Sequence, residues 1–197
     1  AHGIVARVEG VNIKSAAVFF ALIFLGGLVE LEDKDLEKAS TTTKLRIISS
    51  GSSLNLSSGL LVFLVLSALF VKAPMGLVVI EVSEGGPLEL AGFQRWDILF
   101  AVNGTPIRAF HDLGIFMTNV TPGERLILST NRGNVSITAA SDPDEPGRAI
   151  IGLLRSMSYY PSRIGLGFFW DVQLYLTLNW MFILLVNLAI FSMLPIC

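Results

Sequence analysis

The sequence carries little charge. Only 15% of its 197 residues are Asp, Glu, Lys or Arg, whereas a soluble domain usually has about a quarter. The formal net charge is −2, so the basic footprint of a nucleic-acid-binding protein is absent and nucleic acid is not an expected partner. The single cysteine, Cys197, excludes an internal disulfide and a metal site made of several cysteines.

The missing charge is concentrated in two stretches. Residues 47–71 and 172–197 contain no Asp, Glu, Lys or Arg, and a helix needs about 20 mostly apolar residues to cross a bilayer. We therefore expect transmembrane helices at 41–72 and 168–195, on either side of a water-soluble insert. A soluble protein with two fully buried helices is the alternative.

A third apolar segment, residues 13–30, is too short to cross a bilayer as a helix. Its β-branched and aromatic residues favour strands, and Gly26-Gly27 stands near its end. The segment is therefore predicted to form a membrane-associated β-hairpin. Its backbone must pair with itself or be covered by protein, because lipid satisfies no hydrogen bonds.

The insert, residues 74–150, has the pattern of an α+β domain. Asn103-Gly104 is a tight-turn pair that favours positive φ, and the spacing of apolar residues predicts a helix over 110–120. Short β-branched or aromatic runs predict strands at 78–80, 98–100, 126–129 and 135–138.

The motifs of this insert resemble those of PDZ domains in bacterial and archaeal proteases. They occur in the order Met75-Gly76-Leu77-Val78, Gly85-Gly86-Pro87, Ala91-Gly92-Phe93, Asp97-Ile98-Leu99 and Val102-Asn103-Gly104. One position departs from the pattern, because Trp96 stands where the family usually has Gly before the Asp.

PDZ domains bind extended peptides, often at a free carboxyl end, by adding a strand to a sheet edge. The resemblance implies that backbone amides of Gly76, Leu77 and Val78 meet the carboxylate of a peptide or protein C-terminus. The groove would lie between strand 77–82 and helix 110–120. The other reading is a domain that restricts access to the membrane segment without gripping a terminus.

The first residues, Ala1-His2-Gly3, resemble the end of the metalloprotease motif His-Glu-x-x-His followed by Gly. That motif places two His on one helix face to bind one Zn²⁺, with the Glu as general base. On this alignment residues 1–12 are the end of the zinc-motif helix and His2 is a zinc ligand. The first His and the catalytic Glu are expected just upstream of Ala1.

The last residues, 187–196, resemble the segment before a second motif of the same proteases. In that motif a helix breaks near Asn-x-x-Pro, and an Asp that follows is the third zinc ligand. Pro195 matches the pattern, whereas Ser192 stands where Asn is usual. The resemblance gives these two residues a role in positioning the substrate, and the Asp is expected after Cys197.

Taken together, the order of these segments resembles the site-2 protease family. The resemblance implies zinc-dependent intramembrane proteolysis of membrane-protein substrates, in the manner of regulated intramembrane proteolysis. With His2 as the only expected ligand in view, this stretch of chain alone is predicted not to hold zinc tightly.

A non-catalytic membrane scaffold that recruits proteins through the PDZ-like domain is the alternative. A transporter or channel is disfavoured, because the central stretches of the two spans, within 47–71 and 172–197, lack the charged residues such functions usually need.

Two crossings would return the chain to its starting side, so His2 and Pro195 are expected at one face of the bilayer. The basic residues just before the charge-free stretch 47–71 favour a cytoplasmic connector and an extracytoplasmic PDZ-like domain, in the cell membrane. These residues are Lys34, Lys38, Lys44 and Arg46.

Overall fold

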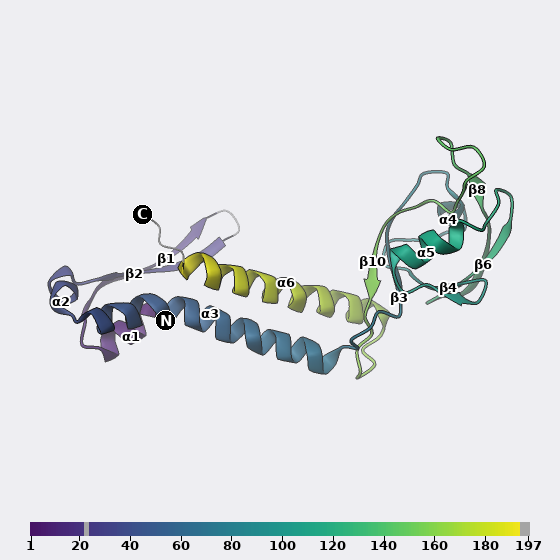
Figure 1. Ribbon diagram of the computed structural model, residues 1–197. Coiled ribbons are helices and arrows are strands. Elements are labelled where there is room, and N and C mark those ends of the chain that lie inside the picture. Colours follow the sequence, from purple (N-terminus) through teal and green to yellow (C-terminus); the bar gives the residue numbers. More distant parts are fainter. Residues whose placement is uncertain (22–23, 194–197) are drawn as a thin grey trace. The chain divides into compact units, whose positions relative to one another are not determined.

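The computed structural model describes residues 1–21 and 24–193 (Figure 1). The chain divides into two compact units. One comprises residues 1–64 together with the chain from Leu178 onward, and the other comprises residues 65–177. The helices α3 (Thr41–Leu69) and α6 (Phe168–Met193) each contribute residues to both units.

The first unit begins with a short helix and a hairpin. Its elements before α3 are α1 (His2–Val8), β1 (Ile13–Ala21), β2 (Phe24–Leu31) and α2 (Asp33–Lys38). The strands pair antiparallel, from Ile13 opposite Leu31 to Ala21 opposite Phe24. The strand conformation expected for this segment is confirmed where the backbone is described; Leu22 and Ile23 lie outside the described residues. Association of the hairpin with the membrane stays a prediction.

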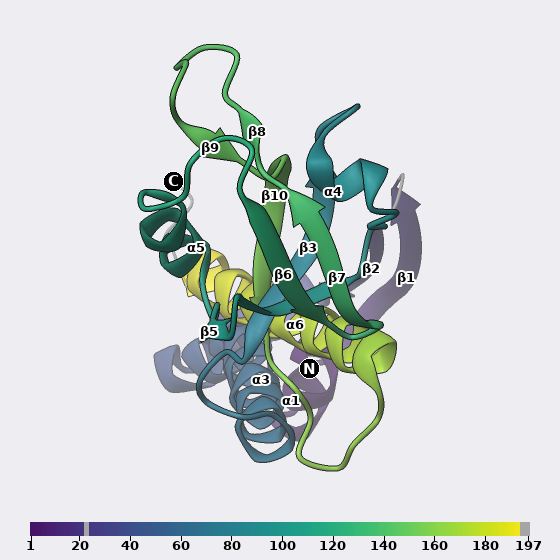
Figure 2. The same ribbon diagram turned by 90° about the vertical axis from the view of Figure 1, so that its right-hand side faces the viewer.

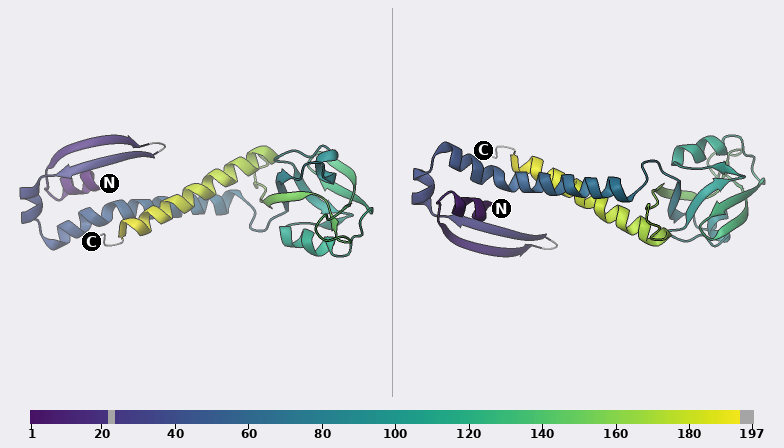
Figure 3. Two further views of the ribbon diagram at one scale, coloured as in Figure 1. Left: turned by 90° about the horizontal axis from the view of Figure 1, so that it is seen from above. Right: turned by 90° about the horizontal axis from the view of Figure 1, so that it is seen from below.

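Within the first unit α3 and α6 pack antiparallel (Figures 1 and 3). A Cβ added at Gly59 would lie 3.2 Å from Cγ2 of Val186, and the rings of Phe63 and Phe182 are 5.6 Å apart. Small residues allow such close approach between apolar helices. The absence of a side chain at Gly59 therefore permits the close approach of the two helices at this point.

Both helices are long and apolar enough to cross a membrane, judged by length and composition. In the most apolar part of each, only 22% of α3 and 6% of α6 is buried. A core helix of a soluble protein would be mostly buried, so this exposure disfavours the alternative of two fully buried helices.

The second unit is built on an antiparallel sheet (Figure 2). The strand order is β10 (Leu153–Tyr159), β3 (Gly76–Val82), β4 (Ile98–Val102), β6 (Arg125–Thr130) and β7 (Gly133–Thr138), with β5 (Thr105–Pro106) paired to β4. The remaining elements are α4 (Pro87–Leu90), α5 (Phe110–Met117), β8 (Ala140–Ser141) and β9 (Ala149–Ile150).

The strands expected at four places are confirmed as β3, β4, β6 and β7. One face of the sheet packs on α5 and α4. Alternation along β6 places Leu126 and Leu128 in this core, both without solvent exposure, and burying a leucine side chain contributes about 1.5–3 kcal/mol. The other buried members of the core are Leu77, Val79, Leu88, Phe93, Leu99, Val102, Ile107, Leu113, Val120, Ile137, Ala139, Ala149 and Ile151.

The opposite face of the sheet packs on the first turns of α6. Val172 joins Val78, Ile98 and Tyr159 in a second buried cluster. The hydroxyl of Tyr159 donates to Oδ2 of Asp171 at 2.7 Å. The start of α6 is therefore part of the second unit, residues 65–177, which is called the β domain below.

Two turns show how local sequence fits this sheet. Asn103 and Gly104 have φ of 48° and 80°, as expected for their tight turn between β4 and β5. Trp96, the position that departs from the resembled motif, has φ of 79°, a conformation that favours Gly. Its side chain packs against the second cluster, and the Arg95 guanidinium lies 4.7 Å from its ring centroid.

Candidate functional site

Helix α1 packs against both the hairpin and α3 (Figure 3). A Cβ added at Gly3 would lie 3.3 Å from side-chain atoms of Ile13 and Val29. On another side, Ala6 is fully buried and clusters with Ile47 of α3. Small residues at positions 3 and 6 therefore let this short helix fit between its two neighbours.

Polar contacts at the end of α1 fix it to α3. Arg46 Nη1 donates to Glu9 Oε1 at 2.9 Å, and Thr43 Oγ1 donates to Glu9 Oε2 at 3.1 Å. The hydrogen bond from Arg46 lowers the pKa of Glu9, so its carboxylate stays ionised at neutral pH. These contacts orient the helix that carries His2.

The ring of His2 is held by the backbone of α3. Its Nδ1 lies 2.7 Å from the carbonyl oxygen of Ile47. The Ser50 hydroxyl donates to the same carbonyl at 2.7 Å and lies 3.3 Å from Nδ1. Because a carbonyl only accepts hydrogen bonds, Nδ1 carries the proton, and the lone pair of a neutral His2 is on Nε2.

Gly51 provides the space that Nε2 occupies. A Cβ at this position would collide with Nε2 of His2 and lie 2.8 Å from its Cε1. Only glycine therefore lets the imidazole lie against the α3 backbone with Nε2 in this orientation.

This arrangement fits a zinc-ligating histidine. Such a ligand almost always donates its other ring N–H to a carbonyl or carboxylate, which fixes the tautomer and the ring orientation. His2 does so through Ile47. Within residues 1–21 and 24–193, no group of three or more His, Cys, Asp or Glu side chains is placed to hold a metal ion. His2 is therefore a single oriented histidine and not by itself a complete metal site.

The second sequence-predicted motif is placed only in part. Ser192 lies on an exposed face of α6, and its hydroxyl donates to the Leu188 carbonyl at 2.5 Å. The side chain is thus turned back onto its own helix. Pro195 lies outside the described residues, so its expected approach to His2 stays a prediction.

The predicted peptide-binding residues Gly76, Leu77 and Val78 lie on β3. This strand is paired on both sides, with β10 and with β4, and Leu77 and Val78 are buried. Addition of a peptide strand needs an open sheet edge. The edge strand of the sheet on this side is β10, and no other described strand pairs with its outer side.

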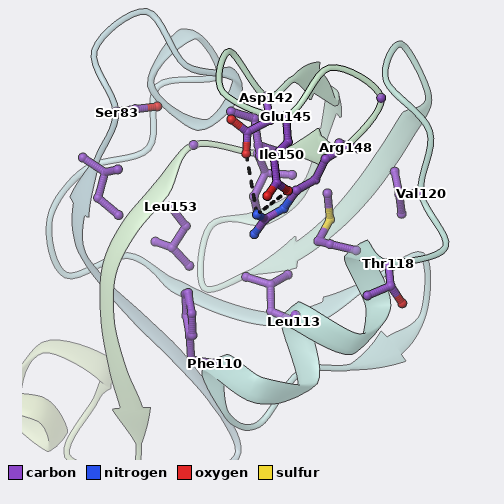
Figure 4. Close-up of a pocket in the computed structure, with 17 residues that line it drawn as sticks. Ser83, Phe110, Leu113, Thr118, Val120, Asp142, Glu145, Arg148, Ile150 and Leu153 are labelled. Carbon is purple, nitrogen blue, oxygen red and sulfur yellow. Dashed lines mark hydrogen bonds and ion pairs between the residues drawn. The ribbon is translucent and has the colours of Figure 1, made fainter.

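A cavity of about 760 Å³ lies between α5 and the chain leading into β10 (Figure 4). Asp112 fixes the start of α5, because its Oδ2 accepts the backbone N–H groups of Arg108 and Ala109, both at 2.9 Å. These hydrogen bonds lower the pKa of Asp112. Apolar side chains form much of the lining: Phe110, Leu113, Met117, Val120, Ile150 and Leu153.

Sequence reasoning did not identify β10 and the residues leading into it, 148–159, as one side of this cavity. The available signal was the apolar run Ile150 to Leu154 after Gly147, followed by Met157 and Tyr159 in alternation. Arg155 and Ser156 interrupt the pattern, and β10 has irregular register at these positions. An edge strand with one open side therefore gave a mixed signal.

Comparison with known proteins assigns the chain to a family. The model of Peptidase family M50 matches residues 1–197. The chain therefore belongs to peptidase family M50, the family of the site-2 proteases that its motifs resemble.

Individual relatives match shorter regions. An uncharacterized protein from Methanocaldococcus jannaschii is 30% identical over 139 residues, which is 70% of this chain and 37% of that protein. A probable periplasmic serine endoprotease, DegP-like, from Brucella suis is 31% identical over 78 residues, 38% of this chain and 15% of the relative. The chain thus spans well under half the length of these curated relatives.

Proposed function

We propose that the full-length protein is a zinc-dependent intramembrane protease and that His2 is one of its zinc ligands. The observation that carries this proposal is the ring of His2, which is fixed at Nδ1 by the Ile47 carbonyl and presents Nε2 beside Gly51. Membership of peptidase family M50 supports it. The remaining ligands and the general-base Glu are expected outside residues 1–197.

Bound zinc would supply an acidified water, with a pKa of about 7, and would polarise the peptide carbonyl that is cleaved. The residues of this chain have separate tasks. The Ile47 carbonyl holds His2 in the tautomer that leaves Nε2 basic. Ser50 shares that carbonyl, and Gly51 leaves the ring the space to keep its orientation.

The hairpin is proposed to hold the substrate extended. A peptide bond in a membrane helix is already hydrogen-bonded, so cleavage needs an unwound segment. Each hairpin strand uses one edge to pair with the other, which leaves an outer edge where the substrate backbone can pair. Val18 and Leu28 are exposed apolar side chains on these strands. Ser192 and Pro195 are proposed to position the same substrate segment.

The two apolar helices are proposed to cross the cell membrane, with lipid covering their exposed side chains and the β domain on the extracytoplasmic side. The family and the composition of α3 and α6 support this placement. The partners are then the lipid bilayer and membrane-protein substrates.

The β domain is proposed to act as a PDZ-like module that binds a peptide or protein C-terminus and gates substrate access. The motif resemblance supports this role. The geometry favours the groove between β10 and α5, because β10 is a sheet edge and a cavity lies beside it. Gly76, Leu77 and Val78 would then support the groove from the neighbouring strand.

The test is cleavage of a model membrane substrate by the full-length protein carrying His2→Ala. Cleavage should be lost while membrane insertion is retained, because the change removes a ligand and not a span. The sequence contains one other histidine, His111 on the exposed side of α5, and His111→Ala is the matched control for the catalytic step. Undiminished cleavage by the His2 variant would refute the assignment. Absence of cleavage by the wild type, with partners still bound, would favour the scaffold alternative.

A further inference from the structure

The mouth of the groove carries three charged side chains from one loop (Figure 4). Nη1 of Arg148 lies 3.1 Å from Oε2 of Glu145 and 3.8 Å from Oδ2 of Asp142. The loop is also closed by its backbone, since the Asp142 N–H donates to the Arg148 carbonyl at 2.9 Å. Arg148 is therefore held beside the cavity by a short closed loop.

The two carboxylates differ in their environment. The Asp142 side chain is 16% exposed, and its Oδ1 accepts the backbone N–H of Asp144 at 3.0 Å. The Glu145 side chain is 67% exposed. Asp142 is thus part of the loop framework, whereas Glu145 can leave the guanidinium without disturbing the loop.

The charges of the lining determine what the groove can accept. Among the described residues that line the cavity, Arg148 is the one cation. A peptide that adds antiparallel to the outer edge of β10 places its carboxyl end beside the start of that strand, which follows Arg148 closely in the chain. Its last side chain would enter the apolar part of the cavity, between Leu113 and Leu153. The fitting occupant is a peptide with an apolar last residue and a free carboxylate.

We propose that Glu145 is an internal competitor for this carboxylate. Its own carboxylate pairs with the guanidinium that the peptide end needs, so the loop 142–148 holds the groove in a self-paired state and lowers its affinity. This inference rests on the proposed binding of peptide ends by the β domain. It makes Glu145 and Arg148 the residues that set the affinity and end-group specificity of the groove.

The expected effects follow from the strength of the pairs. Exposed ion pairs are weak, so removal of the Glu145 charge should tighten binding of a free-carboxylate peptide by about two- to five-fold. Removal of the Arg148 charge should abolish the preference for a free carboxylate, because a charge-assisted hydrogen bond to the peptide end is lost. Binding of the corresponding C-terminal amide should change little in either variant.

The experiment measures binding of a fluorescein-labelled decapeptide ending in Leu-Val to the detergent-solubilised full-length protein. The peptide is used as the free acid and as the carboxamide, with wild type, Glu145→Gln, Arg148→Gln and Glu84→Gln. Glu84 is exposed and does not itself line the cavity, although its neighbour Ser83 does, so Glu84→Gln gives the same change in charge outside the lining and away from Arg148. Tighter binding of the free acid by Glu145→Gln alone is the expected result.

Each other outcome contradicts a defined step. Equal gains in Glu145→Gln and Glu84→Gln would reduce the effect to net charge and overturn the competitor role. Wild-type preference for the free acid with no change in Glu145→Gln would overturn the competitor role but leave peptide-end binding in place. Failure of both wild type and Glu145→Gln to bind either peptide would overturn peptide-end binding itself.

Discussion

In the β domain, large apolar side chains point at one another, whereas on α3 and α6 the same residue types point outward. Leu128 of β6 has no exposed surface, but Leu184 of α6 is 55% exposed. Burial of apolar side chains, as in the β domain, is what the hydrophobic effect drives in water. Exposure of apolar side chains, as on α3 and α6, suits the lipid that is proposed to surround these helices.

The residues that are buried also differ between the two regions. In the first unit they are mostly small, such as Ala6, Ser52, Gly59 and Ala189, whereas the β domain buries leucine, isoleucine and phenylalanine. In lipid there is little hydrophobic drive between helices, so association depends on close backbone approach through small residues. The difference indicates that the two regions are stabilised by different forces.

The largest expected effect comes from the core of the β domain. Leu128→Ala should destabilise this domain by about 2–5 kcal/mol, because it removes buried methyl groups and leaves a cavity. Leu61→Ala on α3, where the side chain is 63% exposed, should change the stability of the β domain by less than about 0.5 kcal/mol. Hydrogen exchange of β6 amides in the full-length protein measures the stability of the β domain in both variants. Equal losses of stability would contradict the proposed difference between the two regions.

Introduction of a charge should be costly on α6, where lipid is proposed to cover the exposed side chains. Leu184→Arg should reduce membrane insertion of α6 by about 2.5–3.5 kcal/mol if that helix spans the bilayer. The control is Ile127→Arg on β6, where a side chain of similar exposure, 51%, faces water and should tolerate the charge. A glycosylation-based insertion assay reads out the first variant, and unaltered insertion would argue against a span.

A smaller effect is expected where α6 joins the β domain. Burial raises the pKa of Tyr159, so its hydroxyl stays protonated and donates to Asp171, whose other oxygen has no partner among the described residues. Tyr159→Phe should therefore cost about 1–3 kcal/mol by leaving a buried carboxylate unsatisfied. Thermal unfolding compares it with Tyr160→Phe, where the ring that stacks on Tyr175 is retained. Equal melting temperatures would show that the hydrogen bond does not stabilise this junction.

Much of the fold could be predicted from the sequence, because the signals were local. Two charge-free stretches predicted the long helices, and alternation predicted strands such as β6. The strand β10 was not predicted, since its alternation is irregular. The groove between strand 77–82 and helix 110–120 was expected from the PDZ resemblance, and the sequence did not show that this strand is paired on both sides. The sequence also could not show how His2 is oriented, because Ile47 and Gly51 are distant in the chain and meet it only through packing of α1 on α3.

The central claim, that His2 binds zinc through Nε2, is tested most directly by zinc X-ray absorption spectroscopy of the full-length protein. The wild type should show imidazole scattering from ligands at about 2.0–2.1 Å. His2→Ala should lose one imidazole from this shell or lose bound zinc altogether, whereas His111→Ala should match the wild type. An unchanged zinc spectrum and zinc content in His2→Ala would contradict the account.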